Sequence, residues 1–200
     1  MNKQWNSKVQ FPSDSDFILR ITNASHAPSK SSGNPLLTVE WEVVAPETKD
    51  VAGETYVVAG VKSGPMNHLY YTTCTPGDDE KSAANLERLT GDGERKGFLR
   101  MCFPDNPELI ASFNPETPSP ELLNGLKGKL LYAQMSADTT FQRKSPTPAQ
   151  IEDAKKKKTR AEGDIQVHPV TGAKLVTYLP KVREVFGEAP ASALKPGAGY

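Results

Sequence analysis

The sequence has 200 residues with 24 basic and 24 acidic side chains, so its zero net charge gives no overall attraction to nucleic acid or to an anionic membrane. Proline and glycine account for 32 of the 200 residues, which exceeds the average share of about 12%, or about 24 residues in a chain of this length. This composition argues against a helical bundle and predicts short strands joined by many turns. The length is that of one domain with additions.

No segment has the composition of a secretory signal or a membrane span. The N-terminal "MNKQWNSKVQFPSD" lacks an apolar core, and no run approaches the roughly 18 apolar residues of a spanning helix. Cys74 and Cys102 allow one disulfide at most and match no metal spacing. We therefore expect a cytoplasmic protein with buried, reduced thiols, no cofactor and no membrane partner.

The first part of the chain predicts strands after a polar lead-in at residues 1–15. β-branched and aromatic content indicates a strand at 16–25, and strict alternation indicates a second strand that carries Leu37, Val39, Trp41 and Val43 on one face. The intervening "HAPSKSSGNP" excludes regular structure. Further strands are expected at 55–61 and 68–74.

The middle of the chain predicts short helices. "GDDEKSAANLERLTGDG" has early acidic residues and a closing glycine, and Asn106 and Ser119 are each followed by a proline at the first helical position. The last of these helices is expected to end at Asn124-Gly125.

A strand at 129–137 precedes an insertion at 138–172 that carries a further helix. Thr147 and Gln150 form a capping-box pattern, and the pairs Glu152–Lys156 and Asp153–Lys157 are in the favourable i,i+4 order. A hairpin turning at Pro169–Gly172 leads into the last strand, and the tail 188–200 has no periodicity and is expected to be flexible.

This succession predicts a mainly β fold: a five-stranded OB-like barrel, with short helices between strands 3 and 4 and a helix-bearing insertion between strands 4 and 5. We expect one domain at 1–187, including the insertion 138–172, followed by the tail. In such barrels strands 2 and 3 and the loops joining strands 1–2 and 4–5 bind oligonucleotides or oligosaccharides.

Three segments resemble a phage family of single-stranded DNA-binding proteins with an OB fold, often encoded beside recombination genes. The matching positions are Lys30, Gly33, Leu37, Val39, Trp41 and Val43 in the first segment, Leu126, Gly128 and Lys129 in the second, and Tyr178 and Pro180 in the third. The resemblance extends over about 70 residues and leaves out 62–118 and 138–172. Many such proteins end in an acidic tail, whereas residues 188–200 are nearly uncharged.

The resemblance implies that the protein binds single-stranded DNA without strong sequence preference during phage DNA replication or recombination in the host-cell cytoplasm. The partners implied are single-stranded DNA and a phage recombinase or replication protein, with homo-oligomerisation left open.

Binding of a single strand needs cations along the phosphate path and aromatic rings for base stacking. Residues 141–183 carry 10 basic and 4 acidic side chains. The basic candidates are Arg20, Lys30, Lys62, Arg143, Lys144, Lys155, Lys156, Lys157, Lys158, Arg160 and Lys174. The aromatic candidates are Tyr56, Tyr70, Phe141 and Tyr178, whereas Trp41 is expected in the core and only one of Tyr70 and Tyr71 can share a face.

Alternatives remain open for these residues. The lysine run 155–158 equally fits a solvated helix end that complements the helix dipole, and the tyrosines equally fit packing. Glu40 and Glu42 on the solvent face of the second strand would repel phosphate. A structural or protein-interaction module, such as a virion component or a recombinase accessory without nucleic-acid binding, is therefore the second hypothesis.

An enzyme is not expected from the sequence. His26, His68 and His168 are scattered over predicted loops and turns, and no phosphate-binding glycine loop, HExxH motif or nucleophile elbow is present. The segment "GDGERKG" at 91–97 reads as a glycine-rich turn.

Overall fold

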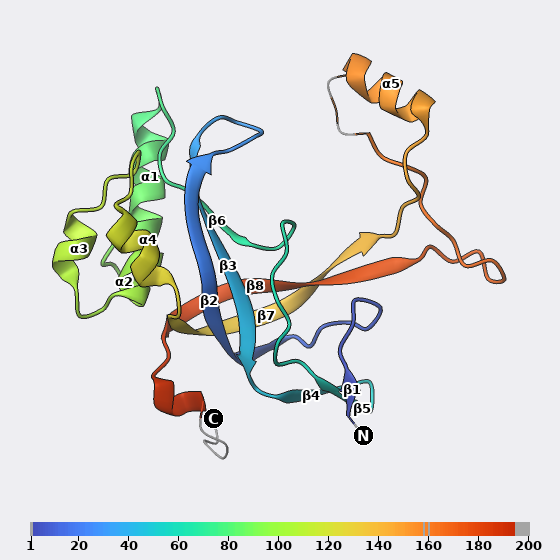
Figure 1. The fold of residues 1–200 in the computed structure, drawn as a ribbon, viewed down its shortest axis with the longest axis horizontal. Coiled ribbons are helices and arrows are strands. Elements are labelled where there is room, and N and C mark those ends of the chain that lie inside the picture. Colours follow the sequence, from blue (N-terminus) through green and yellow to red (C-terminus); the bar gives the residue numbers. More distant parts are fainter. Residues whose placement is uncertain (1, 158, 160, 195–200) are drawn as a thin grey trace.

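The computed structural model of the protein describes residues 2–157, 159 and 161–194, and its main feature is a five-stranded antiparallel sheet (Figure 1). Its strand order is β6-β3-β2-β7-β8. The strands are β2 (Asp14–Pro28), β3 (Pro35–Ala45), β6 (Leu69–Thr72), β7 (Leu130–Phe141) and β8 (Val176–Glu188). A mainly β fold is thus confirmed.

The β2–β3 hairpin follows the alternation of the sequence. Ile21 pairs with Trp41, and the register is shifted between Ile18 and Leu19 and again between Ile21 and Asn23. Such bulges increase the local twist of a strand. The loop at 29–34 closes the hairpin with Gly33 at φ 74°, a conformation that glycine adopts without steric cost.

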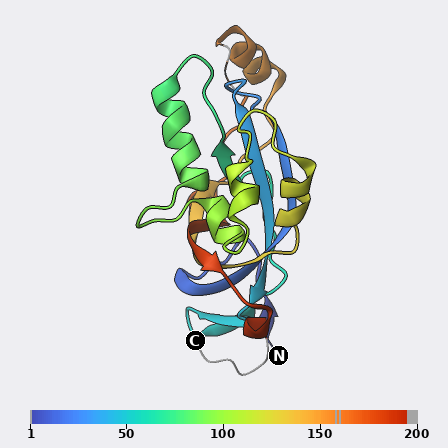
Figure 2. The same ribbon diagram turned by 90° about the vertical axis from the view of Figure 1, so that its left-hand side faces the viewer.

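Four short helices cover one side of the sheet, as both views show (Figures 1 and 2): α1 (Asp79–Thr90), α2 (Phe98–Cys102), α3 (Pro107–Ala111) and α4 (Pro120–Leu126). The expected caps are confirmed: the side chains of Asn106 and Ser119 accept from the backbone N–H groups of Leu109 and Leu122. Apolar helix residues such as Leu99 pack with Ile21, Leu37 and Val39 in one core cluster.

Two details of the helical region were not predicted. Helix α2 begins at Phe98 and has Gly97 as its N-cap, without a side-chain cap, so its start carries no sequence signal. Helix α4 continues one residue past Gly125 to Leu126, and Gly128, at φ 82°, provides the left-handed residue instead.

The expectation of a polar lead-in at residues 1–15 is wrong. Phe11 is completely buried in a second core cluster, with its ring centroid 5.2 Å from Trp5 and 5.3 Å from Phe17. Trp41, expected in the core, is confirmed there. One buried aromatic residue in a polar stretch creates no periodicity, which is why the sequence pattern did not show it.

The predicted strand at 55–61 ends early and belongs to another sheet. β5 (Glu54–Val57) pairs with β4 (Thr48–Val51) and, in parallel, with β1 (Lys3–Gln4). Beyond Val57 the chain turns at Gly60, φ 84°, and Val61 accepts a backbone hydrogen bond from Val43. The third strand of the main sheet is β6, within the predicted 68–74.

The predicted barrel does not close in the described part of the chain. β6 and β8 are the two edges of the sheet, and no strand pairing joins them. The Asn67 side chain spans the gap by donating a 2.5 Å hydrogen bond to the carbonyl of Pro180.

The insertion extends the sheet as a long two-stranded arm. Pairing of β7 with β8 continues to Phe141 and Val176, and helix α5 (Pro148–Lys157) lies at its far end (Figure 1). The expected hairpin turn is confirmed, because the N–H of Gly172 bonds the carbonyl of His168. The capping box is confirmed as well, with Gln150 N 3.3 Å from Thr147 Oγ1 and Thr147 N 2.9 Å from Gln150 Oε1.

The expected flexible tail is wrong for its first residues. Ala189 and Ala193 are buried against Ile18 and Leu130, and residues Ala191–Leu194 form the 3₁₀ turn η1. Small alanine side chains seal this contact without a recognisable apolar pattern. The remainder of the predicted tail, 195–200, lies outside the described residues. Within the described residues, no helix is long and apolar enough to cross a membrane.

Candidate nucleic-acid interface

The outer face of β2 and β3 carries charges that neutralise one another. Arg20 Nη1 lies 3.0 Å from one carboxylate oxygen of Glu42, and Lys62 Nζ lies 3.9 Å from the other. Glu40 accepts a 3.0 Å hydrogen bond from the side-chain amide of Asn23. Two predicted binding cations, Arg20 and Lys62, are therefore engaged with a carboxylate, and the face has no surplus positive charge.

Strand β6 exposes one aromatic ring on this side of the sheet. Tyr70 is 44% exposed, its hydroxyl donates a 2.6 Å hydrogen bond to the carbonyl of Pro65, and its ring lies 5.9 Å from that of His68. Tyr71 faces the helices, where it stacks on Phe98 at 4.6 Å, and burial raises its pKa. The expectation that only one of the two tyrosines faces outward is confirmed.

The loop at 29–34 presents Lys30 to solvent. Hydrogen bonds from Gly33 N to Ser29 O and from Ser29 N to Asn34 O hold the loop, and among the described residues Lys30 has no ion pair. Both views place this loop and helix α5 toward the same end of the sheet (Figures 1 and 2).

The arm carries Phe141 and Lys174 together. Lys174 Nζ lies 5.2 Å from the centroid of the Phe141 ring, which is 43% exposed. The Arg143 guanidinium is 3.0 Å from Glu162 and donates to the carbonyl of Gly163, so it braces the arm. Tyr178 is half-buried, and its backbone N–H donates to Ser7.

Helix α5 holds two of its lysines in the predicted pairs: Lys156 lies 3.4 Å from Glu152 and Lys157 lies 2.8 Å from Asp153. Over the described ranges, Lys144 and Lys155 are exposed and form no ion pair. Lys158 and Arg160 lie outside the described residues.

Tyr56 lies apart from these residues. It is buried in the small sheet, and its hydroxyl donates a 2.6 Å hydrogen bond to Glu54. Its ring therefore packs and presents no free stacking surface. The β-branched and aromatic residues of "TYVV" predicted a strand and did not reveal that this segment leaves the main sheet.

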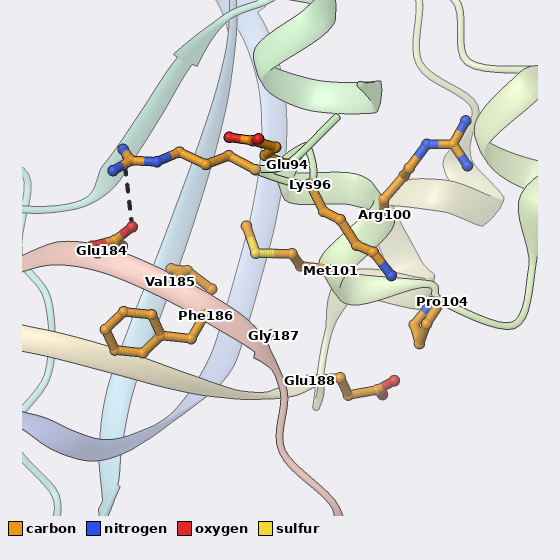
Figure 3. A pocket seen from close by; sticks show the side chains of 11 residues that line it. Glu94, Lys96, Arg100, Met101, Pro104, Glu184, Val185, Phe186, Gly187 and Glu188 are labelled. Atoms are coloured by element: carbon orange, nitrogen blue, oxygen red, sulfur yellow. Dashed lines mark ion pairs between the residues drawn. The ribbon is translucent and has the colours of Figure 1, made fainter. Parts of the chain in front are cut away.

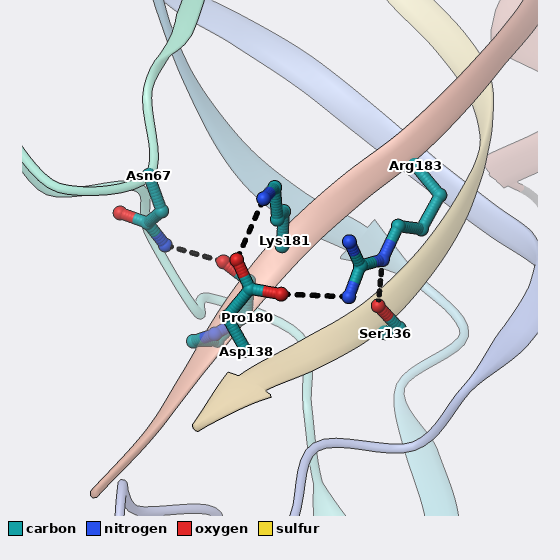
Figure 4. Close-up of polar contacts among 6 residues, drawn as sticks. All are labelled: Asn67, Ser136, Asp138, Pro180, Lys181 and Arg183. Atoms are coloured by element: carbon teal, nitrogen blue, oxygen red, sulfur yellow. Dashed lines mark hydrogen bonds and ion pairs between the residues drawn. The ribbon is translucent and has the colours of Figure 1, made fainter. Parts of the chain in front are cut away.

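A polar cluster at the base of the arm was not foreseen from the sequence (Figure 4). Asp138 on β7 binds Lys181 Nζ at 2.6 Å and Arg183 Nη2 at 2.7 Å, both on β8. Arg183 also donates to the hydroxyl of Ser136. A sequence signal for this cluster exists: Lys181 and Arg183 are two residues apart on one strand, and Ser136 and Asp138 are two residues apart on the adjacent strand.

A cavity of about 550 Å³ lies between β8 and the loop before α2 (Figure 3). Arg95, Lys96 and Arg100 line it on one side, with Glu184 and Glu188 on the strand. Arg95 reaches Glu184 at 4.0 Å. Opposite charges on its walls make this cavity a poor match for an anion.

The histidines and cysteines form no reactive cluster. His26 is half-buried with its Nε2 3.1 Å from the hydroxyl of Thr73, and desolvation lowers its pKa. Cys74 and Cys102 are free and buried, as expected, and burial raises the pKa of both thiols. In the described part of the chain, no group of three potential metal ligands is present.

The chain was compared with known proteins at the level of family models, curated sequences and solved structures. It matches no family model, no curated protein and no solved structure. The candidate interface therefore stands on its residues and geometry.

Proposed function

We propose that the protein binds single-stranded DNA without strong sequence preference, using a partly open OB-like sheet. The observation that carries this proposal is the strand order β6-β3-β2-β7-β8. It puts the third and fifth strands of the main sheet at the two edges, which are the strands that would have to meet for the sheet to curl into an OB barrel. The loop at 29–34 then joins strands 1 and 2, and the arm joins strands 4 and 5, the two connections with which OB folds grip oligonucleotides.

The distribution of unpaired groups supports the same interface. The outer face of β2 and β3 is electrically neutral, whereas Lys30 on the first loop, Lys144 on the arm and Lys155 on α5 are free to contact phosphates. Tyr70 and Phe141 offer exposed rings for base stacking, a contact that contributes about 1–3 kcal/mol per base. The lysines of the two connections would supply the phosphate contacts, and the aromatic residues would supply the base stacking.

The resemblance of three segments to phage single-stranded DNA-binding proteins supports a role in phage DNA replication or recombination, in the host-cell cytoplasm. In that role the protein would coat and protect single strands, and it would not act as an enzyme. A phage recombinase or replication protein would be its partner.

Fluorescence anisotropy of a labelled oligo-dT strand tests the proposal, with unlabelled duplex of matched length as competitor. We expect binding that prefers the single strand and weakens as salt rises, since released counterions contribute about 0.7 to the logarithmic salt slope per phosphate contact. The triple variant K30Q/K144Q/K155Q should lower that slope by about 2 if each lysine makes one contact. No binding by the wild-type protein at low salt would refute the proposal.

A protein-interaction module is the second candidate, and the cavity beside β8 favours it. Phe186 on its rim is 50% exposed, and the two signs of charge around it suit a polypeptide better than a phosphate backbone. Light scattering coupled to size-exclusion chromatography would support this candidate if it finds a discrete oligomer or recombinase complex in the absence of any oligonucleotide affinity.

A further inference from the structure

We propose that Lys181 and Arg183 form a phosphate-binding site at the base of the arm, which Asp138 occupies when DNA is absent. The inference rests on the proposed binding of single-stranded DNA and adds a specific contact to it. Neither cation belongs to the basic run of the insertion. Both lie where the paired strands leave the main sheet (Figure 4).

Strand pairing places the charges together. Ser136 pairs with Lys181 and Asp138 with Leu179, and the buried Met135 and Val182 point to the opposite face. The side chains of Ser136, Asp138, Lys181 and Arg183 therefore share one outer surface. The ladder fixes Lys181 opposite Ser136, whereas Arg183 lies at the register shift between Val182 and Glu184 and is held by its side-chain bonds to Ser136 and Asp138.

A single carboxylate forms ion pairs with two cations in this cluster. Asp138 Oδ2 lies 2.6 Å from Lys181 and Oδ1 lies 2.7 Å from Arg183, so the cluster keeps one uncompensated positive charge. Its two cations, led by Lys181, lower the pKa of Asp138, which keeps the carboxylate ionised at neutral pH. A phosphate carries the same pair of anionic oxygens in a similar arrangement and is matched by the planar guanidinium.

The cations remain accessible and oriented. The side chains of Lys181 and Arg183 are 46% and 42% exposed, and Arg183 is aligned by its bonds to Asp138 and Ser136. Arg183 Nη1 makes no hydrogen bond within the described residues, so one donor already points away from the carboxylate. Lys181 uses one of its three donors on Asp138.

This arrangement predicts that Asp138 competes with DNA. The variant D138N removes the competing charge and should raise oligo-dT affinity severalfold at low salt. The matched control D105N makes the same change of net charge on the exposed turn between α2 and α3, and its affinity should stay near that of the wild type. The double variant K181Q/R183Q removes both positive charges and should lower the logarithmic salt slope by about 1.4, the value for two phosphate contacts.

Two further variants separate binding from folding. K127Q removes one cation at the end of α4 and should leave the salt slope within about 0.3 of wild type, since a residue outside the contact releases no counterion. K181R/R183K keeps both charges and should retain binding. Thermal unfolding followed by circular dichroism identifies any variant that loses its fold.

The outcomes are distinct. Wild-type binding together with unchanged affinity in D138N and an unchanged slope in K181Q/R183Q would overturn this site and leave the proposed function standing. An equal gain in D138N and D105N would also overturn it, because the effect would then be one of net charge. Absence of wild-type binding at low salt would overturn both proposals.

Discussion

Replacement of Phe11 by alanine should lower the free energy of unfolding by about 3–5 kcal/mol, the usual cost of truncating a buried aromatic residue. The side chain is 0% exposed and touches two other rings, 5.2 Å from Trp5 and 5.3 Å from Phe17. Burial of a phenylalanine contributes about 1.5–3 kcal/mol, and each aromatic pair adds about 0.5–1.5 kcal/mol. These contributions together account for the expected loss.

Urea unfolding followed by tryptophan fluorescence measures this change, because Trp5 and Trp41 lie in the same core cluster. We expect a lower urea concentration at the midpoint and an unchanged dependence of the free energy of unfolding on urea. The lost free energy should be a large part of the 5–15 kcal/mol that is typical of a domain. Phe11→Leu is the matched control: it keeps most of the apolar volume and loses the two ring pairs, so it should cost less than Phe11→Ala. A loss below about 1 kcal/mol for Phe11→Ala would refute the packing of residues 1–15 into the core.

Three further predictions concern single side chains. Thr73→Val should cost about 1–3 kcal/mol in urea unfolding, because the buried hydroxyl donates to the carbonyl of Pro115, which would be left without this donor; a neutral effect would contradict that bond. NMR titration should give His26 a pKa below its ordinary value, because desolvation disfavours the charged ring. The free energy of unfolding should therefore fall as the pH drops below about 6.5 and level off below the folded-state pKa. A measured pKa above the ordinary value of histidine would contradict the desolvation. K155Q should lower the salt slope of oligo-dT binding by about 0.7, and K157Q by less, since Lys157 is held by its i,i+4 partner; equal effects would argue against individual phosphate contacts.

The sequence was sufficient to predict features that depend on local pattern. The alternation from Leu37 to Val43 identified β3 and its buried face, and Asn106 and Ser119 marked two helix starts because capping involves residues only three positions apart. The Thr147 capping box and the helix pairs of the insertion followed for the same reason. Each of these features is decided within about one helical turn or one strand.

Features that depend on distant partners could not be predicted. The burial of Phe11 requires Phe17 and Trp41 to come together in one core cluster. The polar residues around Phe11 carry no pattern that predicts its packing there. The separation of β5 from the main sheet depends on its pairing with β1, a two-residue strand near the N-terminus. The barrel was expected from the number of strands, whereas closure depends on the spacing of β6 and β8.

The candidate site also contains features that depend on local sequence and features that depend on distant partners. Lys30, Phe141 and Lys144 could be predicted as exposed because their sequence neighbours are polar, whereas for Tyr70 the sequence left packing and exposure open. The engagement of Arg20 with Glu42 and of Arg183 with Asp138 depends on cross-strand register, which the sequence leaves open.

The arm formed by β7 and β8 has a consequence for how the protein responds to a ligand. Near Leu131 its ladder is supported by β2, whereas beyond Asp138, among the described strands, β7 and β8 pair only with each other and one backbone bond from Tyr178 to Ser7 adds support. An isolated two-stranded ribbon is marginally stable in water, so local opening should become easier from the sheet outward. A ligand held between the tip and the sheet would reduce this fraying, and part of its binding free energy would appear as slower amide hydrogen exchange in the arm.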